Sequence, residues 1–165
     1  MCQKYNADIV IRLTADCPLI DPVIIDKAIS TFMADASLDY LANTVPVEAS
    51  QYPDGSDVEI FSMKALERAH HEAKDLKDRE HVTFYFWKGN HGFKTYQLKN
   101  DQDWSKYRIT VDYPEDFEVI NRVIKLLKSE NKFGTLEEII NLLKSHKEIV
   151  SLNKNYYFGI GWKDK

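Results

Sequence analysis

The segment Arg12-Leu-Thr-Ala-Asp-Cys-Pro18 is echoed about a hundred residues later by Arg108-Ile-Thr-Val-Asp-Tyr-Pro114. Each run contains or follows β-forming residues, which is typical of a strand that ends just before its proline. Side chains alternate along a strand, so the Arg, Thr and Asp of each run share one face. Asp16 and Asp112 then stand at strand carboxyl ends, where open α/β sheets bind ligands. Two such carboxylates could hold one divalent cation, unless each is only a turn or cap residue.

Composition limits the classes of protein to consider. The 165 residues are 44% apolar, which is enough for one domain with a real core. The 22 basic and 26 acidic residues are interspersed and form no basic stripe, which disfavours nucleic acid binding. The sequence shows neither a membrane span nor a signal peptide, so we expect a cytoplasmic protein. Cys2 and Cys17 suit neither a zinc site nor a disulfide framework and are predicted to be plain thiols.

Strand and helix patterns alternate along the chain. Capping residues predict helices that begin after Asp21, Ser62, Tyr113 and Thr135. Further elements are predicted as strands over 8–14, 40–44, 57–61, 93–98 and 107–111 and a helix over 79–87. This alternation predicts an α/β fold, a three-layer sandwich with a mixed, mainly parallel sheet. We expect one domain over residues 1–152 and an aromatic tail over 153–165, which either straps the domain or contacts another chain.

The first strand is unusual because it is apolar on both faces. Such a strand normally lies at the centre of a sheet, with neighbours on both edges, yet almost nothing precedes it here. The six glycines also form no phosphate-binding loop between a strand and a helix. Both observations predict that an N-terminal part of the parent fold is missing. An uncovered apolar strand further predicts self-association.

Four further features occur in order as the motifs Arg12-Leu-Thr-Ala-Asp-Cys-Pro-Leu-Ile-Asp-Pro22, Tyr52-Pro-Asp-Gly-Ser-Asp-Val-Glu-Ile-Phe-Ser62, Arg79-Glu-His-Val-Thr83 and Arg108-Ile-Thr-Val-Asp-Tyr-Pro-Glu-Asp-Phe117. Together they resemble the motifs of the cytidylyltransferase family of spore coat polysaccharide biosynthesis protein F, which is related to the CMP-sialic acid and CMP-Kdo synthetases. The resemblance implies a nucleotide-diphospho-sugar transferase-like fold, truncated at its N-terminus. It also implies magnesium-dependent transfer of CMP from CTP to a sugar acid in polysaccharide biosynthesis, with release of pyrophosphate. The family's opening Arg-Leu-Pro-Gly-Lys loop has no counterpart, so the isolated chain is expected to be inactive.

The resemblance also assigns site residues. Asp16 and Asp112 are the expected catalytic magnesium ligands, because magnesium prefers carboxylates combined with substrate phosphates. The expected substrate-binding residues are Arg12, Gly55, Asp57, Glu59 and His81. The structural alternatives are an Asp-Gly turn before a strand for Gly55, Asp57 and Glu59, and a structural hydrogen bond for His81. Arg12 and also Arg108 could instead pair with neighbouring acids on the sheet.

Three functions remain open from the sequence. The first is a CMP-sugar synthetase domain. The second is a noncatalytic remnant or interaction module that keeps this fold, and the third is a metal-dependent glycosyltransferase. The sequence leaves the sugar and the oligomeric state undetermined.

Overall fold

The computed structural model describes residues 6–160, so Cys2 and Trp162 lie outside the described residues. Four strands form one sheet in the order β1 (Ile9–Arg12), β3 (Glu59–Ser62), β2 (Tyr40–Ala42) and β4 (Thr95–Gln97). Strand β3 runs antiparallel to both β1 and β2, and β2 runs parallel to β4. Three of the four strands therefore share one direction, which confirms the predicted mixed sheet.

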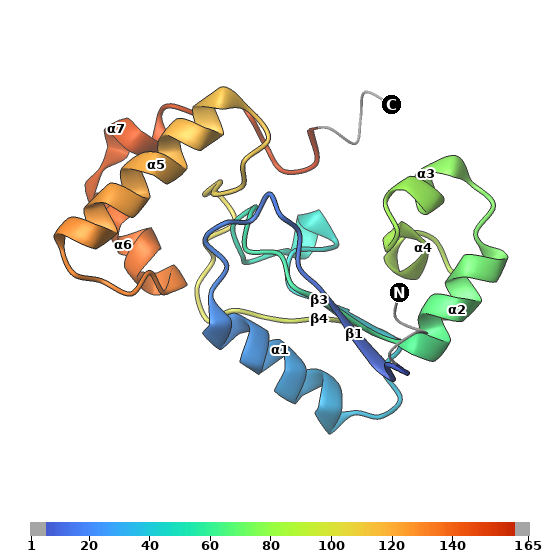
Figure 1. The fold of residues 1–165 in the computed structure, drawn as a ribbon. Helices are drawn as coiled ribbons and strands as arrows, with labels where there is room; N and C mark the ends of the chain where they lie inside the picture. The colour runs from blue at the N-terminus through green and yellow to red at the C-terminus, as the bar shows by residue number, and fades with distance from the viewer. Residues whose placement is uncertain (1–5, 161–165) are drawn as a thin grey trace.

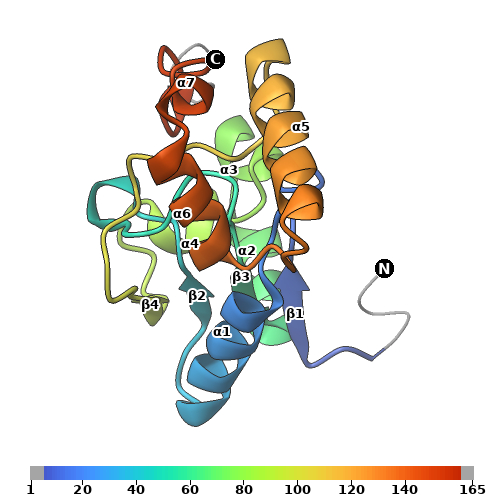
Figure 2. The ribbon, with the colours of Figure 1, turned by 90° about the vertical axis from the view of Figure 1, so that its left-hand side faces the viewer.

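Helices cover both faces of this sheet (Figure 1). Leu41 and Ile60 pack into a core with α1 (Pro22–Ala34), α5 (Pro114–Ser129) and α6 (Leu136–Ser145). Tyr40 and Phe61 pack on the other face with α2 (Met63–Glu72) and α4 (Phe84–Trp87). The remaining elements are α3 (Leu76–Glu80), α7 (Lys147–Val150) and the 3-10 turn η2 (Val47–Ala49). The three-layer sandwich is confirmed, and in the view of Figure 2 α5 and α6 lie above α1. Within residues 6–160 no helix is long and apolar enough to cross a bilayer.

The predicted helix caps form. Ser62 Oγ accepts a hydrogen bond from Ala65 N at 3.0 Å, and Thr135 Oγ1 accepts one from Glu138 N at 3.3 Å. Asp21 serves two helices at once, because its Oδ1 accepts from Val23 N at 2.8 Å and its Oδ2 from Leu136 N at 2.7 Å. This buried carboxylate therefore joins the N-terminal ends of α1 and α6.

The predicted helix over 79–87 is interrupted. Helices α3 and α4 are separated by a turn at Val82, whose φ of 56° lies in the left-handed region. The break lets Phe86 stack on Tyr40 and Phe61, with ring centroids 5.0 and 5.3 Å apart, while α3 buries none of its residues. Tertiary packing of aromatic side chains overrides the local helical pattern here.

The predicted strand over 107–111 is also wrong. The segment makes a single parallel bridge, between Asp54 and Arg108. Ile109 N donates to Asp54 O at 2.7 Å, and Val111 N donates to Asp16 O at 2.9 Å. The segment thus divides its backbone hydrogen bonds between two loops instead of pairing with one strand.

Strand β1 is an edge strand within the described sheet, not the central strand predicted. It pairs with β3 alone among the described residues. Ile9 and Ile11 are 37% and 41% exposed, and Leu13, next along the same face, is 44% exposed. An unpaired edge beside an exposed apolar face favours association between molecules.

We predict that Asp21→Ala lowers the free energy of unfolding by about 2 kcal/mol, because two caps are lost at about 1 kcal/mol each. Ser62→Ala is the matched control, since it removes one cap and should cost about 1 kcal/mol. Urea unfolding of both variants measures the difference. Equal losses in the two variants would show that the bond to Leu136 contributes nothing.

We also predict that the wild-type chain self-associates at micromolar concentration and that the double variant Ile9→Lys, Ile11→Lys is monomeric. The added charges interrupt the apolar face and oppose edge-to-edge pairing. Sedimentation velocity measures the change. Leu76→Lys is the control, because Leu76 is 83% exposed on α3, away from β1. A monomeric wild-type protein would contradict the prediction.

Candidate functional site

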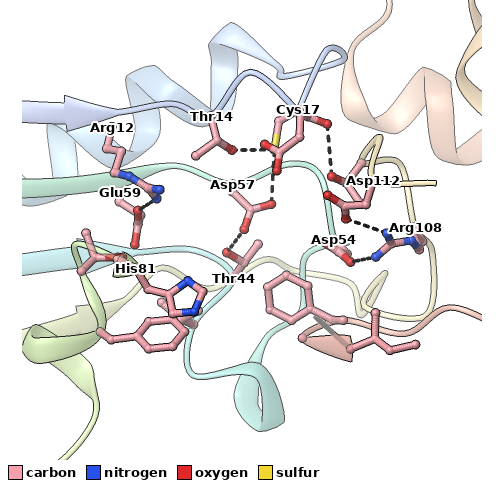
Figure 3. A pocket seen from close by; sticks show the side chains of 18 of the residues that line it. Arg12, Thr14, Cys17, Thr44, Asp54, Asp57, Glu59, His81, Arg108 and Asp112 are labelled. Carbon is pink, nitrogen blue, oxygen red and sulfur yellow. Dashed lines mark hydrogen bonds and ion pairs between the residues drawn. The ribbon is translucent and has the colours of Figure 1, made fainter. Parts of the chain in front are cut away.

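A cavity of about 460 Å³ opens where β1 and β2 end and β3 begins (Figure 3). The carboxyl ends of strands are the usual ligand-binding edge of an α/β sheet. The predicted site residues that line this cavity are Arg12, Asp16, Asp57, Glu59, His81 and Asp112. Six of the seven predicted residues therefore meet, although they come from four separate stretches of the chain.

The two echoed motifs lie side by side at this cavity. Asp16 O accepts hydrogen bonds from Val111 N at 2.9 Å and from Thr110 Oγ1 at 3.1 Å. The Arg, Thr and Asp of both motifs line the cavity, as their shared face predicted. The Asp112 side chain is 46% exposed there. Asp16 and Asp112 thus border one space that is accessible to a ligand.

Gly55 has a structural role in a turn, which was the alternative to substrate binding. Its φ is 99°, and a Cβ added to it would lie 2.2 Å from Thr110 N. Only glycine tolerates both this conformation and this close approach. Gly55 is not among the residues that line the cavity. Its role is to let the loop before β3 pack against the backbone at residues 109–110.

Arg12 also forms the predicted ion pair. Its Nη1 lies 2.5 Å from Glu59 Oε2, and Tyr40 OH donates to Glu59 Oε1 at 2.5 Å. Burial and the Glu59 charge raise the pKa of Tyr40, so its hydroxyl stays protonated and donates. Glu59 is buried, whereas the Arg12 side chain is 35% exposed and borders the cavity.

Asp57 lies at the base of the cavity (Figure 3). Thr44 Oγ1 donates to Asp57 Oδ1 at 2.6 Å, and Gly55 N donates to its Oδ2 at 2.9 Å. Burial raises the pKa of Asp57, although these hydrogen bonds oppose the rise. Burial and the Asp57 charge in turn raise the pKa of the Cys17 thiol well above its usual range. Cys17 is therefore a protonated thiol, in agreement with the plain thiol predicted for it.

Arg108 is held by three carboxylates. Its side chain is 6% exposed and pairs with Asp54 through Nη1, with Asp112 through Nη2 at 2.7 Å, and with Asp116 through Nε at 2.9 Å and Nη2 at 2.8 Å. Burial alone would lower the pKa of Arg108, but these partners raise it. Burial would likewise raise the pKa of Asp116, but hydrogen bonds from Arg108 and Asn153 lower it. The ion-pair alternative for Arg108 is the one that the structure contains.

Asp54 and Asp116 are the members of this network that the sequence predictions missed. Asp54 precedes Gly55 in a turn-forming Asp-Gly pair, and Asp116 occupies the third position of α5, which is a common capping position. Both local patterns suggest a structural residue and gave no sign of the cavity. Asp54 and Asp116 are connected to each other through the buried Arg108, with which both form ion pairs.

His81 lies at the end of α3 and lines the cavity. Its ring stacks on Phe84 with centroids 4.1 Å apart and planes 25° apart. The next residue, Val82, is β-branched and left-handed, a costly backbone conformation that is often found at functional sites. His81 therefore packs against Phe84 and also lines the cavity.

The described part of the aromatic tail packs on the domain. Tyr156 stacks on Tyr113 with ring centroids 4.0 Å apart, and Phe158 lines the cavity. Asn153 is buried and donates to Asp116 Oδ1 at 2.8 Å. Over residues 153–160 the chain therefore acts as a packing strap and forms one wall of the cavity.

The cavity offers two carboxylates that could contribute to a metal site. Among residues 6–160 no group of three or more His, Cys, Asp and Glu side chains is arranged to hold a metal ion. Asp16 and Asp112 supply two carboxylates at the cavity. This donor set fits Mg²⁺, which is commonly held by one or two carboxylates and completed by substrate phosphates and water.

We predict that stability falls with rising pH because of Asp54. Burial and the Asp57 charge raise the pKa of Asp54 to about 8, although Arg108 opposes the shift. An unfolded Asp titrates near pH 3.9, so the native state binds this proton more tightly. The stabilisation is complete below about pH 4 and is lost as the pH approaches about 8.

Asp54→Asn removes this titration, so the wild-type protein should lose stability relative to the variant between pH 5 and pH 8. The slope is at most about 1.4 kcal/mol per pH unit. Urea unfolding at several pH values measures it, with Asp26→Asn on the exposed face of α1 as the control. Parallel pH curves for the wild type and Asp54→Asn would contradict the assignment.

The chain is similar to known cytidylyltransferases. A family model described as Cytidylyltransferase matches residues 1–159. A solved cytidylyltransferase from Leptospira borgpetersenii serovar Hardjo-bovis is 32% identical, with a TM-score of 0.81 over 90% of this chain and 61% of that one. An uncharacterized protein of Methanocaldococcus jannaschii is 29% identical over 153 residues, which is 92% of this chain and 59% of that protein.

A shorter match is to the 3-deoxy-manno-octulosonate cytidylyltransferase of Geobacter metallireducens. It is 33% identical over 94 residues, covering 48% of this chain and 36% of that protein. The chain therefore spans between about a third and three fifths of the length of these relatives.

Proposed function

The chain belongs to the cytidylyltransferase family, and on that premise we propose that it takes part in transferring CMP from CTP to a sugar acid, with release of pyrophosphate. The observation that carries the proposal is the meeting of Asp16 and Asp112 at one cavity. The 3-deoxy-manno-octulosonate cytidylyltransferase relative supports a sugar-acid acceptor. The resemblance to spore coat polysaccharide biosynthesis protein F supports a role in polysaccharide or glycoconjugate synthesis.

In this proposal Asp16 and Asp112 hold Mg²⁺. The sugar hydroxyl attacks the α-phosphorus of CTP, the new oxygen–phosphorus bond forms, the bond to pyrophosphate breaks, and the hydroxyl proton is released to solvent. Mg²⁺ held by these two carboxylates would supply positive charge to offset that of the phosphate oxygens. Asp112 is accessible at the cavity, and its Oδ2 already accepts from a cationic group, Arg108 Nη2. The exposed part of the carboxylate is on the cavity side, where it remains accessible to a cation.

The acceptor sugar occupies the part of the cavity between Arg12 and His81. Arg12 is fixed by Glu59 but still a third exposed, so its remaining N–H groups can meet the carboxylate of a sugar acid. His81 approaches from the turn between α3 and α4 (Figure 3). Asp57 lines the same cavity, and its hydrogen bonds with Thr44 and Gly55 keep the loop before β3 in place.

Nucleotide binding is the sharper test, because it depends directly on the proposed metal site. We expect CTP with Mg²⁺ to bind more tightly than UTP with Mg²⁺, measured by isothermal titration calorimetry. Asp16→Asn and Asp112→Asn should each weaken CTP binding by at least about tenfold, because each removes one carboxylate from the metal.

Asp26→Asn on α1 is the matched control and should bind like the wild type. Equal CTP affinity in all four proteins would disprove the shared metal site. Pyrophosphate release with CTP, Mg²⁺ and a panel of sugar acids and neutral sugars tests the reaction itself. Release with neutral sugars alone would contradict the sugar-acid acceptor.

A further inference from the structure

Asp116 makes more hydrogen bonds than a helix cap needs. Its side chain is fully buried at the third position of α5. Its Oδ2 accepts from Asp112 N and Tyr113 N, both at 3.1 Å, as an N-terminal capping residue does. Both of its oxygens also accept from Arg108, and Oδ1 accepts from Asn153 Nδ2 at 2.8 Å. Asp116 does not line the cavity.

We propose that Asp116 is a positioning residue for Asp112, which it holds in place for metal binding through Arg108 and through the Asp112 backbone. The inference rests on the proposed function, in which Asp112 is a metal ligand. Asp116 controls both ends of Asp112: it accepts the Asp112 N–H directly, and it fixes the guanidinium whose Nη2 binds the Asp112 carboxylate at 2.7 Å. Hydrogen-bonded partners of ligating carboxylates are known to tune metal affinity in this way.

The geometry of Arg108 makes the positioning specific. The Nε and Nη2 atoms bind the two oxygens of Asp116, which fixes the plane of the guanidinium. Nη1 and Nη2 then point to Asp54 and Asp112 in set directions. Without the Asp116 charge, Arg108 would keep only its partners on the cavity side and could turn toward them. The Asp112 carboxylate would lose its fixed orientation.

Asn153 supports the same arrangement from the C-terminal segment. It is buried, and its Nδ2 donates to Asp116 Oδ1 at 2.8 Å and to Arg108 O at 3.2 Å. The stack of Tyr156 on Tyr113, beside Asp112, closes the same side of the network. The strap over residues 153–160 thereby supports Asp112 indirectly, through Asp116 and Arg108.

The chain contains a matched control in Glu138. It occupies the third position of α6, and its Oε2 accepts from Gly134 N at 2.8 Å and Thr135 N at 3.0 Å. Glu138 therefore performs the same capping task as Asp116, but it does not line the cavity. Loss of a cap and loss of positioning can be separated by comparing these two residues.

The experiment compares Asp116→Asn, Asn153→Ala, Asp112→Asn and Glu138→Gln with the wild type. The first measurement is the dissociation constant for Mn²⁺ alone, from water proton relaxation. We expect Asp116→Asn to weaken Mn²⁺ binding by about 10- to 100-fold. Asn153→Ala should weaken it less, and Glu138→Gln should leave it unchanged within about twofold, because it makes the same loss of charge at a capping position that has no contact with Arg108.

The second measurement is solvent exchange of the Arg108 Nε–Hε proton by nitrogen-15 NMR. This proton is bonded to Asp116 Oδ1, so its exchange should be slow in the wild type and in Asp112→Asn but fast in Asp116→Asn. A folded Asp116→Asn variant with wild-type Mn²⁺ affinity, or with slow Hε exchange, would overturn the inference. If that variant does not fold, wild-type Mn²⁺ affinity in Asn153→Ala overturns it instead.

The Asp112→Asn variant separates failure of the proposed metal role of Asp112 from failure of the positioning role of Asp116. If Asp112→Asn binds Mn²⁺ like the wild type, or the wild type binds none, the proposed metal role of Asp112 is wrong. The positioning of Arg108 by Asp116 is then judged from the Hε exchange alone. If Asp112→Asn loses Mn²⁺ binding while Asp116→Asn keeps it, the metal role stands and the positioning role is wrong.

Discussion

The buried guanidinium of Arg108 is the constraint on which the rest of the site depends. A charge taken out of water is costly unless it is paired and fully hydrogen-bonded. Here the carboxylates come from the loop before β3, from the segment after Arg108 and from α5. Satisfying one cation therefore draws three parts of the chain together. Gly55 makes this possible, because a side chain there would collide with the backbone at residues 109–110.

The same constraint gives the cavity its electrostatic character. One arginine cannot neutralise three carboxylates together with the nearby Asp57, and burial adds to the cost of each charge. The pKa of Asp54 is raised because this side chain is buried next to Asp57. The Asp112 carboxylate, in contrast, is exposed on the cavity side. A site with surplus negative charge and an accessible carboxylate attracts a cation together with an anionic ligand.

The sequence predicted those features that depend on short local patterns. Helix caps at Asp21, Ser62 and Thr135 depend on a few adjacent residues, and they formed as expected. The shared face of each Arg-Thr-Asp motif is also local, and both faces reach the cavity. The break at Val82 was not predictable in this way, because it is imposed by aromatic packing against strands far away in sequence.

Two further features could not be predicted from local patterns, because they depend on partners far away in sequence. They are the position of β1 at the sheet edge and the path of residues 107–111 between two loops. Asp54 and Asp116 were missed for the same reason. Each has an ordinary turn or capping pattern, and its second role exists only because Arg108 is buried between them. The sequence therefore predicted which residues face the cavity better than it predicted which residues hold them there.

The two echoed motifs show how one pattern serves two purposes. Arg12 and Arg108 occupy equivalent positions, yet Arg12 is a third exposed with one carboxylate partner, and Arg108 is buried with three. An arginine with unused donors at the cavity can adapt to an anionic substrate, whereas one with its donors directed at three acids can only hold its surroundings in place. The first motif is thus suited to contact the ligand and the second to fix the geometry. The carboxylates of both motifs still reach the same cavity, one on a wall that can adjust and one on a wall that cannot.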